Sequence, residues 1–263
     1  MVVGGANETG GVLDRAGFVD VHCCPAVESY SRVWPDYTTT LRAVRGFYRA
    51  GEARKCGGAY CTTWEFMHGA IVENSWYGLI FAAECSWSPA STTVEDFDRR
   101  FADVWWGIRG GDSTQRMADT MVFPIPSGGR AGMWHWGRAV SEVLWTPADR
   151  IMREFSLKQK QYTEAAPDLV ALSDGARERA ARLAAQATRN QLTFRAADLA
   201  FGMMGYSGRK LTVFGDATAL YLQAARDLPQ DPAAAADGLA RAAESIDRLA
   251  EEAGELASGY QFF

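Results

Sequence analysis

The sequence lacks the features that mark a membrane protein, a signal peptide or a nucleic-acid-binding protein. None of its stretches reaches about 18 consecutive apolar residues, the minimum for a membrane-spanning helix. Residues 1–13 have neither the basic start nor the apolar run of a signal peptide. With 27 basic and 32 acidic side chains the net charge is −5. This balance predicts neither a nucleic acid nor a membrane as a partner.

Cysteine is too scarce and too irregularly spaced to predict a disulfide framework or a metal site. The chain has five, an odd number, and none forms a CxxC pair or stands at metal-ligand spacing from a histidine. They are Cys23, Cys24, Cys56, Cys61 and Cys85. We expect reduced, mostly buried thiols, with Cys23 and Cys61 as small core residues, and neither a metal ion nor a cofactor.

What the chain does contain is a strand–helix pattern that occurs twice between residues 18 and 89. Apolar strands are expected at Gly17–Cys24 and Gly58–Thr63, with a helix at Thr38–Lys55 between them. A nearly wholly apolar, buried helix is expected at Trp76–Trp87. Consecutive strand–helix units of this length are typical of an α/β barrel of the TIM type.

The remainder of the chain predicts helices. One is expected from Val94 to about Trp106. Residues 107–164 are broken by Gly and Pro and rich in Trp, which indicates a connecting region that packs between domains or walls a site. Residues 165–263 predict an antiparallel bundle of three helices, and the protein should be predominantly helical. We therefore expect three parts, residues 1–106, 107–164 and 165–263.

The bundle helices are expected from Ser173 to a break at Gly205 and Gly208, from Asp216 to Leu228, and after Pro232. The last of them should bury one stripe of side chains. That stripe consists of Leu239, Ala242, Ile246, Leu249, Ala253 and Leu256. Its charged residues lie off the stripe and predict a solvated face.

Polar and aromatic side chains follow each of the two predicted strands. In barrels of strand–helix units the functional groups lie at the carboxyl ends of the strands. The side chains at these places are Glu28, Tyr30, Trp34, Trp64, Glu65 and His68. Aromatic rings with carboxylates are typical of a sugar site, and the nine Trp residues of the chain favour a stacking surface.

The motifs CCPAVESYSRVW, GGAYCTTWE and YGLIFAAECSW, within Val21–Trp87, carry a resemblance to a known family. This run resembles the last two strand–helix units of the catalytic barrel of glycoside hydrolase family 20, the β-N-acetylhexosaminidases. Members with a helical tail after the barrel are the most similar in character. The resemblance covers about a quarter of the chain, and it implies a partial barrel that binds an amino-sugar-containing glycan.

The resemblance also implies roles for individual residues. Trp64 corresponds to the tryptophan that walls the sugar pocket in that family, and Glu65 to a carboxylate that holds sugar hydroxyls. Tyr30 falls where related sequences carry an aromatic residue, and Trp34 and His68 complete the predicted binding residues. Many members have one residue between the Trp and the Glu, whereas here the two are adjacent. Core packing for Trp64 and helix capping or an ion pair for Glu65 are the alternatives.

The family's catalytic groups have no counterpart in this chain. In that family the substrate's acetamido group attacks the anomeric carbon, and an adjacent Asp-Glu pair orients it and protonates the leaving oxygen. The sequence has no Asp-Glu dipeptide, and its nearest pair, Glu95-Asp96, has the reverse order. Glu28 could act as an acid, but a single carboxylate in a polar loop is more often solvated or capping. We therefore assign no catalytic residue.

Two functions follow from these patterns. The chain is expected to be the C-terminal portion of a longer glycoside hydrolase, inactive alone and able to pair with the missing N-terminal half of the barrel. The alternative is a non-catalytic module that binds carbohydrate or protein.

Overall fold

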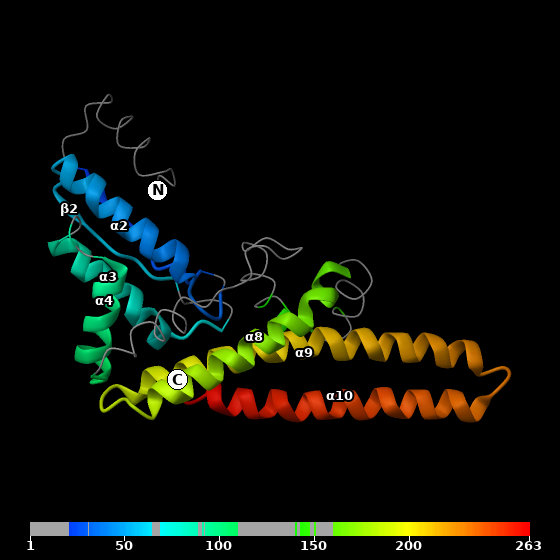
Figure 1. Cartoon of the computed structure of the whole chain (residues 1–263). Coiled ribbons are helices and arrows are strands. Elements are labelled where there is room, and N and C mark those ends of the chain that lie inside the picture. The colour runs from blue at the N-terminus through cyan, green and yellow to red at the C-terminus, as the bar shows by residue number, and fades with distance from the viewer. Residues whose placement is uncertain are drawn as a thin grey trace. The chain divides into compact units, whose positions relative to one another are not determined.

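The structure, a computed structural model, describes residues 21–30, 32–64, 69–88, 91, 93–109, 140, 143–147, 150 and 160–263, the last range with side chains from residue 166. Its described part is predominantly helical, as the sequence predicts (Figure 1). Two compact units divide the chain. The first comprises Met1–Pro124 and Ala181–Phe194, and the second comprises Ile125–Ala180 and Arg195–Phe263.

A parallel pair of short strands opens the described part of the first unit. β1 (His22–Cys23) pairs with β2 (Gly58–Ala59), and a bridge between Ala26 and Thr62 extends the pairing. The register places His22 opposite Gly58 and Cys23 opposite Ala59. Both strands are shorter than predicted within the described residues, and residues 17–20 lie outside them. A parallel pair requires a crossover connection between its strands, which is most often a helix.

Helix α2 (Tyr37–Ala53) makes this connection, close to its predicted bounds. It starts at Asp36, whose carboxylate accepts hydrogen bonds from the amide and the hydroxyl of Thr39, at 3.0 and 2.8 Å. Such an N-cap satisfies an amide that the first helical turn would otherwise leave unpaired. The buried face of α2 carries Tyr37, Leu41 and Val44 at helical spacing. The local sequence therefore fixes both the start of α2 and its orientation.

Helix α3 (Trp76–Trp87) has the bounds that the sequence predicts. It follows a 3-10 turn, η1 (Val72–Ser75), and contacts both α2 and α4 (Val94–Phe101). The α3–α4 contact contains aromatic rings with centroids 5.0–5.2 Å apart, from Tyr77, Phe81, Phe97 and Phe101. The helix is less buried than the sequence predicts, because only one face of α3 is buried and Trp87 is 89% exposed.

A π-helical segment, η2 (Ala102–Trp106), continues α4, so the two together fill the helix predicted at residues 94–106. Its last carbonyls are bound by the turn between α8 (Lys160–Ala184) and α9 (Gln191–Asp227). The Thr188 and Arg189 amides donate to the Trp106 carbonyl (2.9 and 3.1 Å), and the Asn190 side chain donates to the Trp105 carbonyl (2.6 Å). The turn satisfies carbonyls that the helix end would leave unpaired.

The second unit contains a helical bundle, in which α9 runs antiparallel to α10 (Pro232–Tyr260; Figure 1). The predicted bounds of its first two helices were wrong, because α9 continues through Gly205 and Gly208. The break lies instead before α9, at Asn190, which has a left-handed φ of 50°. A Cβ on Gly208 would lie 2.8 Å from Val170 Cγ2 and 2.9 Å from the Ala166 carbonyl oxygen. Gly208 therefore permits the close approach of α8 and does not end a helix.

Helix α10 begins where the sequence predicts. The Asp231 carboxylate accepts a hydrogen bond from the Ala234 amide (2.9 Å), and Pro232 occupies the first turn. The buried residues of α10 are Ala235, Gly238, Ala242 and Leu249. Leu239, predicted to lie on the buried stripe, is 45% exposed. Among the described residues, no helix has the length and apolar character needed to span a membrane.

Candidate functional site

Two aromatic side chains meet where β1 and β2 end. The Tyr30 and Trp64 rings lie edge to face, with centroids 6.4 Å apart and an angle of 90° between their planes. Tyr30 is 54% exposed, whereas Trp64 is partly buried. Both follow the carboxyl ends of paired strands, as the sequence analysis predicts. The structure therefore brings together two of the five predicted binding residues.

Hydrogen bonds to the segment after β1 fix the position of Trp64. Its amide donates to the Ser29 hydroxyl (3.2 Å), and Ser29 donates in turn to the Val27 carbonyl (3.3 Å). The indole Nε1 of Trp64 donates to the Thr62 hydroxyl (3.3 Å). Ser29 is buried, so this anchor is shielded from water. Trp64 is consequently held through its amide to the segment after β1 and through its indole to the segment after β2, which favours a preformed surface.

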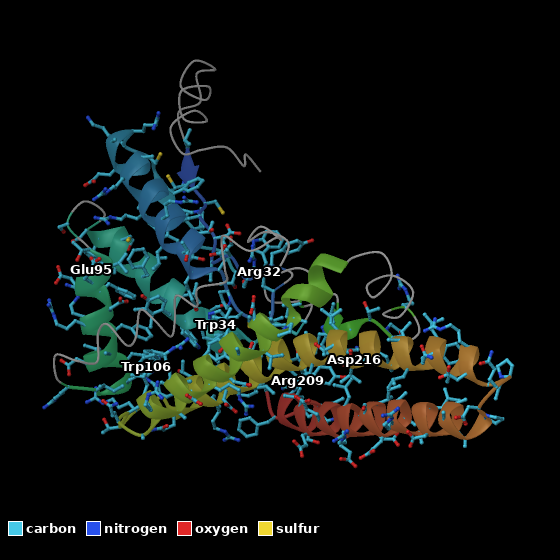
Figure 2. The ribbon with its side chains drawn as sticks, turned by 45° about the vertical axis from the view of Figure 1, so that its right-hand side comes forward. Arg32, Trp34, Glu95, Trp106, Arg209 and Asp216 are labelled. Carbon is cyan, nitrogen blue, oxygen red and sulfur yellow. The ribbon has the colours of Figure 1, made fainter. Side chains whose placement is uncertain are left out.

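The other three predicted residues have different outcomes. Trp34, labelled in Figure 2, is only 3% exposed. Its ring lies edge to face with that of Tyr37, with the centroids 5.9 Å apart. In this arrangement Trp34 supports the loop before α2 from the core and offers little surface to a ligand. Glu65 and His68 lie outside the described residues, and their roles stay predictions.

A partly buried group of three charges lies in the loop after β1 and at the start of α2. Arg32 Nη2 lies 3.8 Å from Asp36 Oδ2, and both side chains are largely buried. The Glu28 amide donates to the Thr40 hydroxyl (2.9 Å), and the Glu28 carbonyl accepts from the Asp36 amide (2.9 Å). These bonds tie the loop after β1 to the first turn of α2. The start of α2 and the loop after β1 therefore form one hydrogen-bonded structure.

The environment of Glu28 differs from that of a solvated carboxylate. Burial raises the pKa of Glu28, the nearby positive charge of Arg32 opposes this shift, and the negative charge of Asp36 adds to it. A carboxyl group with a raised pKa can exchange a proton or accept a hydrogen bond from a ligand hydroxyl. The Glu28 carboxyl group is therefore suited to proton exchange or to binding a hydroxyl, which its position in a loop does not indicate.

Sequence reasoning missed Arg32, Asp36 and Ser29. Asp36 had a local signal, because an Asp three residues before a Thr at the start of a helical pattern is a typical N-cap. Arg32 stands four residues before Asp36, a spacing that also occurs in ion pairs within helices. Nothing in the sequence indicates that Ser29 accepts a hydrogen bond from Trp64, because that bond joins two separate strand ends.

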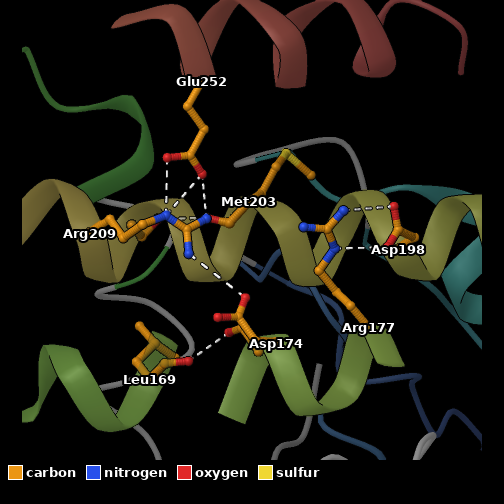
Figure 3. A network of polar contacts seen from close by, with 9 residues as sticks. Leu169, Asp174, Arg177, Asp198, Met203, Arg209 and Glu252 are labelled. Atoms are coloured by element: carbon orange, nitrogen blue, oxygen red, sulfur yellow. Dashed lines mark hydrogen bonds and ion pairs between the residues drawn. The ribbon is translucent and has the colours of Figure 1, made fainter. Parts of the chain in front are cut away.

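A second polar network lies in the bundle and holds its three helices together (Figure 3). Arg209 of α9 donates through Nε to both carboxylate oxygens of Glu252 of α10, at 3.0 Å each. Arg209 Nη1 also lies 3.8 Å from Asp174 Oδ1 of α8. The network borders a hollow of about 600 Å³ with apolar walls that include Val170 and Leu249. Since Arg209 is paired on two sides, we interpret it as structural.

Lys210 is a buried cation in the same unit. Its Nζ donates to the carbonyls of Val143 (3.0 Å), Leu144 (3.1 Å) and Thr146 (2.8 Å). Burial lowers the pKa of Lys210 to about 8. The side chain satisfies three carbonyls of a neighbouring segment. This arrangement also has a structural explanation.

Thiol and metal chemistry find little support in the described residues. All five cysteines are free. Burial raises the pKa of Cys23, Cys61 and Cys85 to about 11 in each case, which disfavours the reactive thiolate. Across the described ranges, no group of three or more His, Cys, Asp or Glu side chains is placed to hold a metal ion. The aromatic and charged groups after β1 and β2 remain the candidate site.

Comparison with known protein families, curated proteins and solved structures finds no match to this chain. Functional inference therefore depends on the residues and the geometry described above.

Proposed function

We propose that this chain supplies the last two strand–helix units of a TIM-type barrel that resembles glycoside hydrolase family 20. Its site would bind a glycan that contains an N-acetylhexosamine. The observation that carries the proposal is the edge-to-face pair of Tyr30 and Trp64 at the carboxyl ends of parallel β1 and β2. A partly exposed aromatic surface, on a loop that also carries the half-buried carboxylate of Glu28, suits the apolar face and the hydroxyls of a pyranose ring. Glu65 and His68 are proposed to complete this site.

Catalysis would need groups that this sequence does not contain. The family's acid and its acetamide-orienting partner form an Asp-Glu dipeptide, which is absent from the 263 residues. We propose that the chain binds sugar but does not hydrolyse glycosides unless the remaining barrel strands are supplied by further sequence or by another polypeptide. Edge groups of β1 and β2 would pair with those strands.

A second candidate is a non-catalytic carbohydrate-binding protein. The absence of the Asp-Glu dipeptide favours it, and so does the anchored position of Trp64, which needs only the two strands described here. The two proposals share the binding site and differ in whether additional strands confer turnover.

Substitution of Trp64 tests the shared binding site. We expect W64A to weaken the binding of N-acetylglucosamine oligomers by about tenfold or more, because a central aromatic contact would be lost. Titration calorimetry measures the affinity directly. W87A is the matched control, because Trp87 lies in the same unit and is 89% exposed on α3. Equal affinities of W64A and the unaltered chain would overturn the proposed site.

Turnover separates the two candidates. The 263-residue chain should release no chromophore from a 4-nitrophenyl N-acetylglucosaminide. Hydrolysis by the chain alone, retained in W87A and abolished in W64A, would contradict the claim that it lacks a catalytic acid.

A further inference from the structure

The end of the α9–α10 hairpin carries large apolar side chains that are exposed. Tyr221 and Leu228 of α9 are 58% and 59% exposed, and Leu239 of α10 is 45% exposed. This end of the hairpin, with the turn between the two helices, extends beyond α8 (Figure 1). Apolar side chains that gather on one surface often mark an interface with another macromolecule.

On α9 these side chains continue a row that the chain itself covers at its other end. The row consists of every seventh residue on one side of the helix, namely Ser207, Phe214, Tyr221 and Leu228. Ser207 donates a hydrogen bond to the Val140 carbonyl (3.1 Å), and Phe214 is buried. The same side of α9 is therefore covered by a segment of this chain near Ser207 and exposed from Tyr221 onwards.

The exposed Leu239 of α10 lies on the same side of the hairpin as Tyr221. A Cβ on Gly238 would lie 4.0 Å from both the Ala224 Cβ and the Leu220 carbonyl oxygen, so Gly238 faces α9 there. Tyr221 follows Leu220 by one residue, and Leu239 follows Gly238 by one residue. Because the two right-handed helices are antiparallel, one residue of advance turns both chains towards the same side of the pair.

Both exposed rows alternate large and small uncharged side chains. The α9 row reads Phe, Thr, Tyr, Ala and Leu at positions 214, 218, 221, 225 and 228. The α10 row reads Ala, Leu, Ala, Ile and Ala at positions 236, 239, 243, 246 and 250. We call the two rows together the hairpin face. A two-fold axis can place the large side chains of one such face against the small ones of an identical face, so the pattern is complementary to itself.

Helix α10 also has the two apolar sides that a helix of a four-helix bundle needs. It buries Ala235, Gly238 and Ala242 within the hairpin, and its second row comes one residue later around the helix. An apolar stripe of this width is typical of helices that pack against two neighbours. The charged residues Asp237 and Arg241 lie outside both stripes.

We propose that the hairpin face binds the hairpin face of a second copy of this chain, in a two-fold symmetric four-helix bundle. At a rise of about 1.5 Å per residue each row is about 21 Å long, and two helices are about 20 Å wide, so the contact covers roughly 400 Å² on each chain. Stable interfaces bury about 800 Å² on each partner, so this dimer is weak and depends on concentration. It is independent of the proposed carbohydrate site, whose residues belong to the first unit.

Analytical ultracentrifugation over a range of protein concentrations tests the association. We expect a dimer with a dissociation constant of about 10–100 μM. Y221E should raise this constant by about tenfold or more, because the association would bury a charge against an apolar face. A219E is the matched control, because Ala219 is exposed on α9 two residues earlier, on the opposite side of the helix. A219E should associate as the unaltered chain does.

A second pair of variants tests the fit of large against small side chains without adding charge. A243L fills a position that the packing reserves for a side chain of the other copy, so it should weaken association by about tenfold. A219L makes the same change on the opposite side of α9 and should have no effect. Circular dichroism confirms that each of the four variants is folded.

The outcomes decide between the second copy and other occupants of the face. A chain that stays monomeric at every concentration would overturn the proposal and leave the face to a different partner. A dimer that Y221E and A243L leave unchanged would also overturn it, because that dimer would use another surface. Weaker association in Y221E and A243L, with unchanged association in A219E and A219L, supports it. The W64A variant should dimerise normally, so this proposal and the carbohydrate site can fail separately.

Discussion

The buried carboxyl group of Asp98 should reduce stability at neutral pH. Asp98 lies on α4, is 3% exposed and accepts a hydrogen bond from the Tyr77 hydroxyl of α3. Burial raises its pKa from 3.8 to about 6, although the bond from Tyr77 acts in the opposite direction; the charge of Glu95 adds to the rise. No lysine or arginine is paired with Asp98 among the described residues. The ionised form is therefore disfavoured in the folded protein.

The sign of the effect follows from proton binding. Between pH 4 and 6 the folded protein holds a proton on Asp98 that the unfolded chain has released, so stability falls as the pH rises through this window. The shift from 3.8 to about 6 corresponds to about 3 kcal/mol. This destabilisation is absent below about pH 4 and reaches its full value above the folded pKa.

Asn at this position keeps the shape and the acceptor for Tyr77 but cannot ionise. We expect D98N to raise the free energy of unfolding by up to about 3 kcal/mol at pH 7.5. The advantage should shrink towards zero at pH 4. Urea unfolding followed by tryptophan fluorescence at several pH values measures both quantities. Other titrating groups are common to the two proteins, so their difference isolates Asp98.

The control is D96N on the same helix. Hydrogen bonds from Thr93 and Arg99 lower the pKa of Asp96. The lowered pKa means that Asp96 contributes stability at neutral pH, and this contribution is lost as the pH falls through the folded pKa. D96N should therefore differ from the unaltered protein in the opposite direction. A D98N protein that is less stable at pH 7.5, or whose advantage does not change with pH, would refute the reasoning.

Further predictions concern the bundle. G208A should destabilise the protein by about 1–3 kcal/mol, because its Cβ would meet the backbone of α8. G254A, with no atom within 4 Å of its Cβ, should instead stabilise α10 by about 0.5–1 kcal/mol. Thermal unfolding of the two variants measures this contrast, and equal melting temperatures would contradict it. Nitrogen-15 NMR of lysine side chains should show one amine that titrates near pH 8 and is missing in K210M. A Lys210 signal that titrates above pH 10 would show that burial does not dominate.

The sequence predicts those parts of the fold that local chemistry decides. The bounds of α3 and the start of α10 were confirmed, because apolar content, Asp231 and Pro232 act within a single turn. The parallel order of β1 and β2 follows from the helical pattern between them. The break between α8 and α9 could not be placed, because a glycine inside a helical pattern signals either an end or a close approach. Only Val170 and Ala166, about forty residues away, decide this for Gly208.

The same distinction applies to the candidate site. The positions of Tyr30 and Trp64 after the strands were predictable from the repeated strand–helix pattern. The burial of Trp34 was not, because the loop before α2 has no periodicity from which a buried face can be inferred. Arg32 was not predicted because the burial of its side chain depends on how the loop packs, which the sequence does not indicate.

The turn after α8 has a consequence for biosynthesis. The first unit needs Thr188 and Asn190 to complete η2, across more than eighty residues of intervening chain. A nascent polypeptide that has emerged from the ribosome only as far as α4 lacks these donors, so this unit cannot finish folding cotranslationally until the bundle segment has also been synthesised. Folding of the first unit is therefore delayed, because its segments are separated in the sequence. A fragment that stops before residue 181 should not attain the same packing.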